Sequence, residues 1–195
     1  MRFPAAYTLS ALLVVMPWPV HDPLTAQPQS RLWVEGKSTL RPFECQAPGM
    51  AITVDADGSG AIPAVLSGHQ AVRAVELTVP VARIECGNAT MNEHMRTALK
   101  SDDAPTIRFI LATYDLQRTA DGAQGTMHGT LSLGGVQHPV DVAAVASSAG
   151  DGLLHIVGSY ELLMSQFDLT PPSLMFGRIK VRDKVRVRFD IVLKS

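Results

Sequence analysis

The 195-residue chain has little charge and few aromatic side chains. Only 18% of its residues are Asp, Glu, Lys or Arg, and only 6% are Phe, Trp or Tyr. An ordinary globular domain has about a quarter of its residues charged. The formal net charge is −1, so there is no basic excess to hold a phosphate backbone, and nucleic acid is not an expected partner.

Motifs that carry chemistry are also missing from the sequence. It contains no GxGxxG, P-loop, GxSxG, HExxH or CxxC pattern, and its glutamates are scattered without an evident catalytic pair. We therefore expect no catalytic residue, no cofactor and no metal site, and classify the protein as a non-enzyme. A hydrolase of unrecognised type remains the alternative, and it would need an activated serine or histidine.

No apolar run reaches the roughly 20 residues that a membrane-spanning helix needs. The apolar run from Ala5 to Met16 follows Arg2 and precedes Pro17, which is the pattern of a signal peptide. We expect residues 1–26 to be a signal peptide, export to the periplasm, and no transmembrane span in the mature protein. Cleavage after Ala26 would place Leu24 where a small residue is usual. An uncleaved anchor or a buried segment are the alternatives.

Cysteine is scarce, and the two present are Cys45 and Cys86. An even number of cysteines in an exported protein favours a disulfide, and the alternative is a pair of buried thiols. On the chain-entropy description, a bond closing a loop of about 40 residues would contribute roughly 4 kcal/mol to stability.

The rest of the chain, residues 30–195, reads as one domain of many strands. The segment Lys184 to Lys194 alternates most clearly, with valine, phenylalanine, isoleucine and leucine on one face and mostly charged residues on the other. This pattern is typical of an antiparallel sheet with one solvated side. Frequent turn signals predict an all-β barrel or sandwich.

One short helix is expected over Met91 to Lys100. Thr90 and Glu93 have the spacing of a capping box, and Met91, Met95 and Leu99 recur on one helix face. We interpret this methionine stripe as core packing, and a pliable ligand contact is the alternative.

Residues 125–146 predict two strands joined by a tight turn at Gly134-Gly135. Pairing around that turn places His128 near Val140 or Asp141, so His128 and His138 should not face each other. On this register His128 points outward, whereas Met127, Leu131 and Leu133 point into the core. We interpret the segment as barrel wall and its histidines as solvent-facing.

Four stretches together resemble one family. They are the first strand at residues 32–43, MNEHMRTALKSDDAPTIRF at 91–109, GTMHGTLSLGGVQHPVDV at 125–142, and the closing section at 164–193, which contains a PP loop and the strand VRDKVRVRF. In this order they are similar to the YceI-like family of exported bacterial proteins. The resemblance implies an antiparallel lipocalin-like β-barrel whose interior binds a long apolar ligand, such as a polyisoprenoid or another lipid. It implies no catalytic residue set.

A barrel of eight strands is either filled by side chains or holds one small ligand. Because the inward positions are mostly small or medium in size, we favour a cavity that binds the ligand. The alternative is a filled barrel that acts as an interaction or stress-related module through loops at 68–73 and 170–177. The ligand-binding candidates share an inward position on an alternating strand, and they are Ile107, Phe109, Leu111, Leu131, Leu133, Val187, Phe189 and Ile191.

Overall fold

The computed structural model describes residues 23–150, 152–174 and 178–195. All but the last few residues of the expected leader lie outside these ranges. The strands are β1 (Leu24–Ala26), β2 (Arg31–Lys37), β3 (Pro42–Gln46), β4 (Ala51–Ala56), β5 (Val72–Pro80), β6 (Thr106–Thr119), β7 (Gly122–Leu133), β8 (Val136–Ser148), β9 (Leu153–Leu163), β10 (Ser173–Leu174), β11 (Ile179–Lys180) and β12 (Lys184–Lys194).

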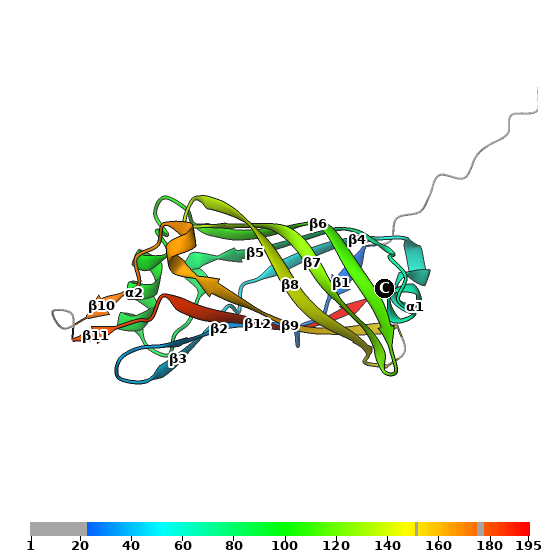
Figure 1. Ribbon diagram of the computed structural model, residues 1–195, viewed down its shortest axis with the longest axis horizontal. Coiled ribbons are helices and arrows are strands. Elements are labelled where there is room, and N and C mark those ends of the chain that lie inside the picture. Colours follow the sequence, from blue (N-terminus) through cyan, green and yellow to red (C-terminus); the bar gives the residue numbers. More distant parts are fainter. Residues whose placement is uncertain (1–22, 151, 175–177) are drawn as a thin grey trace, which may run out of the picture.

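Eight of the described strands close into an antiparallel barrel. Their order is β1-β4-β5-β6-β7-β8-β9-β12, and β12 pairs again with β1 at Ala26–Leu193 and Thr25–Lys194. Strand β2 follows β1 along the same edge of β12, and β3 pairs with β2 beyond the barrel wall (Figure 1). The expected all-β antiparallel barrel is confirmed.

Strand β1 is the piece that joins the two edges of the sheet. Leu24 pairs with Val54 of β4 and is only 2% exposed, and Thr25 pairs with both β4 and β12. Residues 24–26 also fall inside the expected signal peptide of residues 1–26. Cleavage after Ala26 would therefore remove the closing strand.

The alternation in β12 produces the two faces that the sequence predicts. Val185, Ile191 and Leu193 are buried in the barrel. On the outer face Arg186 pairs with Glu161 at 3.0 Å, and Arg188 pairs with Glu35 at 3.0 Å. Such exposed pairs contribute at most about 1 kcal/mol each, so burial of the inner face provides most of the stabilisation of this strand.

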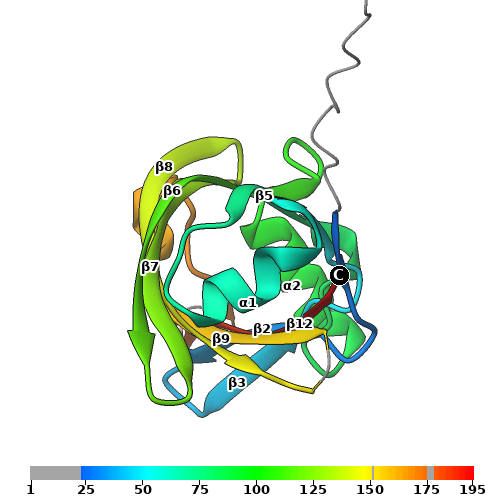
Figure 2. The same cartoon turned by 90° about the vertical axis from the view of Figure 1, so that its right-hand side faces the viewer.

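A six-residue helix, α1 (Ala61–Leu66), closes one end of the barrel (Figure 2). Ala61, Ile62 and Val65 are buried in a cluster with residues of β1, β4, β9 and β12. No pattern in the sequence predicts this helix. It lies directly after the glycine-rich turn at residues 58–60, and six residues are too few to show a helical period.

The second helix, α2 (Ala89–Ala98), lies at the opposite end (Figure 1). It begins two residues before the expected start, and the predicted Thr90 capping box is wrong. Asn88 is the cap: its side-chain oxygen accepts a hydrogen bond from the Met91 amide at 3.0 Å. Asparagine is among the best N-cap residues, and it places Thr90 inside the first turn. Neither α1 nor α2 is long or apolar enough to cross a membrane, and the same holds for the other described helices.

The turn after β7 has the expected register. Gly134 and Gly135 both have positive φ angles, 58° and 85°, as a two-residue hairpin turn requires. Ser132 pairs with Gln137, and His128 pairs with Asp141. The two histidines of this hairpin are therefore not opposite each other, as predicted.

Candidate functional site

Between the two ends, the barrel interior contains a partly open cavity of about 340 Å³. This volume lies within the range of small-molecule sites, roughly 300–1,000 Å³. Its wall extends from Val65 of α1 at one end to Met91 and Met95 of α2 at the other, and it includes residues of both buried clusters, such as Leu154 and Leu162. The cavity is therefore the unfilled middle of an elongated barrel.

All eight predicted ligand-binding residues lie on the wall of this cavity, together with Met127. Their contact with a ligand remains a prediction. The wall also includes residues that were not among the candidates, from β4, β5, β8 and β9 and also from the β2–β3 hairpin and α2. These additional residues include Leu32, Val34, Phe43, Met91, His94 and Met95. The alternation of Leu32 and Val34 could have predicted that these two residues point inward, whereas no local sequence pattern predicts that α2 lies over the cavity.

The wall of the cavity carries almost no charge. Among the described residues it includes no lysine, arginine or glutamate, and its ionisable side chains are His94, Tyr114, Asp115 and Tyr160. The Asp115 carboxylate accepts a hydrogen bond from His128 on the outer face instead. A charged group brought into the cavity would thus lack a counter-ion, and burying it would be costly.

The two tyrosines of the wall have different surroundings. The Tyr114 hydroxyl accepts hydrogen bonds from the amides of Ala71 and Val72, at 2.9 and 3.0 Å, and so ties β6 to the start of β5. Burial raises the pKa of the Tyr160 hydroxyl, and the negative charge of Asp141 raises it further. A tyrosine is already uncharged at neutral pH, and both effects favour this uncharged form further.

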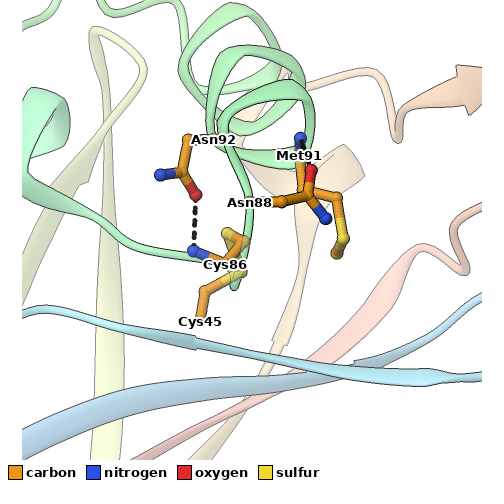
Figure 3. Close-up of a disulfide and its surroundings, with 5 residues drawn as sticks. All are labelled: Cys45, Cys86, Asn88, Met91 and Asn92. Atoms are coloured by element: carbon orange, nitrogen blue, oxygen red, sulfur yellow. Dashed lines mark hydrogen bonds between the residues drawn. A yellow bond between two sulfur atoms is a disulfide. The ribbon is translucent and has the colours of Figure 1, made fainter.

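The predicted disulfide between Cys45 and Cys86 is confirmed, and it lies at the α2 end of the cavity (Figure 3). The two residues are 1% and 4% exposed and join β3 to the segment that leads into α2. The Cys86 amide donates a hydrogen bond to the side-chain oxygen of Asn92, at 2.6 Å. The disulfide and this hydrogen bond together fix the first turn of α2 over the cavity, with Met91 and Met95 on its wall.

Four of the described histidines, His69, His128, His138 and His155, are not on the cavity wall. His128 is hydrogen-bonded to Asp141 at 2.6 Å and to Asp115 at 3.0 Å. His155 contacts Asp190 at 2.8 Å, and the His138 ring lies 5.7 Å from that of Phe167. Within residues 23–150, 152–174 and 178–195, no three His, Cys, Asp or Glu side chains form a group that could hold a metal ion.

A closed antiparallel barrel with an apolar cavity, capped by short helices, defines a lipocalin-like class of protein. The sequence comparison specifies the family: residues 44–193 match the YceI-like domain. The chain therefore belongs to the YceI-like family, which confirms the resemblance seen in its sequence. No curated protein sequence matches the chain.

Solved structures share this fold. BcnA of Burkholderia cenocepacia has a TM-score of 0.66 at 18% identity, over 84% of this chain and 96% of that one. A polyisoprenoid binding domain from Saccharophagus degradans, implicated in plant cell wall breakdown, has a TM-score of 0.60 at 13% identity, over 89% and 97%. A Campylobacter jejuni YceI protein has a TM-score of 0.59 at 16% identity, over 98% of each chain. At these sequence identities, the comparison shows that the fold is shared.

Proposed function

We propose that this protein is an exported, non-enzymatic binding protein for a long apolar ligand, such as a polyisoprenoid or another lipid, held inside the barrel. The observation that carries this proposal is the apolar cavity inside the barrel, whose wall includes all eight predicted residues and neither lysine nor arginine among the described residues. An apolar chain in such a cavity gains about 0.8 kcal/mol for each methylene group removed from water. The relative from Saccharophagus degradans, described as polyisoprenoid-binding, supports the ligand class.

Export to the periplasm is part of the same proposal. The apolar N-terminal run supports a signal peptide within residues 1–26, and a buried disulfide suits an oxidising compartment. Because β1 begins at Leu24, a cleavage site before this residue would leave the barrel closed.

The ligand is tested by extracting the periplasmic protein with organic solvent and analysing the extract by mass spectrometry. A stoichiometric isoprenoid or lipid is the expected result. An empty extract from folded, disulfide-bonded protein that also binds no added isoprenoid would favour the filled-barrel interaction module instead. That alternative assigns activity to the loops at 68–73 and 170–177, of which residues 175–177 lie outside the described part of the chain.

Two neighbouring alanines of β8 give a matched test of where the ligand lies. Ala144 is on the cavity wall, whereas Ala143 is exposed on the outer face. We expect Ala144→Leu to weaken binding of a neutral fluorescent probe such as N-phenylnaphthylamine by about tenfold, because its three added carbon atoms displace apolar contact worth about two buried methylene groups. Ala143→Leu should bind like the unchanged protein. Equal effects of the two substitutions would place binding outside the cavity.

A further inference from the structure

Among the described residues, three phenylalanines lie on the cavity wall, and they share one arrangement. Each ring reaches across to the neighbouring strand and covers a glycine on its inner face. Phe43 of β3 covers Gly36 of β2, its direct partner, and Phe189 of β12 covers Gly158 of β9, also its direct partner. The third pair is diagonal and joins Phe109 of β6 to Gly129 of β7.

The rings leave no space for a side chain at these glycines. A Cβ atom at Gly36 would lie 2.2 Å from Cζ of Phe43, and one at Gly158 would lie 2.2 Å from Cζ of Phe189. At Gly129 the corresponding distance to Cε2 of Phe109 is 2.5 Å. Non-bonded carbon atoms approach to about 3.5–4.0 Å, so each ring tip lies directly against the backbone of the next strand. The rings thus follow the wall and do not cross the cavity.

Backbone conformation does not account for glycine at these positions. None of the three has a positive φ angle, and each lies inside a strand, where glycine weakens the sheet. A close approach by another group is the usual reason for a glycine inside a strand. At Gly36 that group is the phenylalanine ring alone, and at Gly129 and Gly158 it is the ring together with a backbone carbonyl oxygen.

We propose that Gly36, Gly129 and Gly158 are specificity-determining residues that set the width of the cavity. By accepting the phenylalanine rings against the wall, they keep the cavity wide enough for a methyl-branched apolar chain. A larger residue at any of the three would turn the ring toward the cavity axis and leave room for an unbranched chain only. This inference rests on the proposed function.

Gly36→Ala is the sharpest test, because the three atoms nearest to its added Cβ all belong to the Phe43 ring. At Gly129 and Gly158 a backbone carbonyl oxygen is also within 2.5 Å. The probes are farnesol, which is methyl-branched, and dodecanol, which has the same main-chain length without branches. The affinity of each alcohol is measured by its displacement of N-phenylnaphthylamine from the full-length protein. Gly60→Ala is the control, because nothing lies within 4 Å of its added Cβ.

We expect Gly36→Ala to weaken farnesol binding by about tenfold, the loss of about two buried methylene groups, and to leave dodecanol binding nearly unchanged. Adding Phe43→Leu should restore farnesol binding, because the shorter side chain no longer collides with the new methyl group. Gly60→Ala should bind both alcohols like the unchanged protein. Equal losses for the two alcohols, or no rescue by Phe43→Leu, would overturn the proposal.

Two further outcomes can be distinguished from a change in selectivity: no binding by the unchanged protein, and failure of Gly36→Ala to fold. If the unchanged protein binds neither alcohol, the proposed function fails and this inference fails with it. If Gly36→Ala does not fold, a Gly36→Ala/Phe43→Leu double variant that folds and binds both alcohols supports the ring–glycine pairing. A double variant that also fails to fold overturns it, since the glycine would then be required for a reason other than the ring.

Discussion

His128 is held between two carboxylates on the outer wall of the barrel. Hydrogen bonds to Asp115 and then to Asp141 raise its pKa above the ordinary value of 6.5. A raised pKa in the folded state means that protonation favours folding. The resulting stabilisation is fully present below about pH 6.5 and is lost as the pH rises through the raised value.

His128→Gln should therefore remove a pH-dependent part of the stability. We expect the melting temperature of the unchanged protein to be higher than that of the variant. This difference should be largest at about pH 5.5 and should shrink as the pH rises toward about pH 9. Thermal unfolding monitored by circular dichroism across this range measures it. A difference that stays constant with pH would contradict the prediction.

For single residues, alternation of apolar and polar side chains is a reliable guide to which of them point inward. Alternation alone assigns Phe109 and Phe189 to the inner face, and both line the cavity. It does not place Tyr114, because the register of β6 shifts between Leu111 and Thr113 and reverses the parity. The pairing of phenylalanine with glycine is also hidden in the sequence, since it depends on which strands become neighbours.

Among the elements, the helices show where local sequence is a weak guide. Both Thr90 and Asn88 are acceptable N-cap residues, and only the structure shows that Asn88 has this role. Helix α1 has no cap side chain and too few residues for a period, so packing against the barrel end stabilises it more than its own sequence does. Strand β12 was predictable because its alternation continues over eleven residues.

The cap of α2 gives a prediction with an internal control. Asn88→Ala should lower the free energy of unfolding by about 1 kcal/mol, because the Met91 amide loses its hydrogen-bond acceptor. Thr90→Ala should change it little, since Thr90 lies inside the first turn of the helix. Urea unfolding of the two variants measures both effects. A larger loss for Thr90→Ala would instead favour the capping box that the sequence suggests.

For the barrel as a whole, closure depends on three residues near the N-terminus. Without β1, the edges of β4 and β12 would lose their shared partner, and the pocket filled by Leu24 would empty. The position at which the signal peptide is cleaved therefore decides whether the barrel keeps its closing strand.

Two versions of the chain answer it, one beginning at Pro23 and one beginning at Gln27. We expect the shorter version to be less stable by about 2 kcal/mol or more, the contribution of one buried leucine side chain, in urea unfolding. The intact mass of the exported protein should correspondingly include Leu24 to Ala26. Equal stability of the two versions would show that the barrel closes without β1.

The unfilled middle of the barrel also governs how the protein responds to compression. Unfolding lets water into internal voids, so the volume of the system falls when a hollow protein unfolds, and the decrease scales with the void that is lost. With a cavity of about 340 Å³, the empty barrel should yield to hydrostatic pressure more readily than a solid barrel of the same length. An apolar occupant would remove much of that void, so resistance to pressure would report occupancy without any label on the ligand.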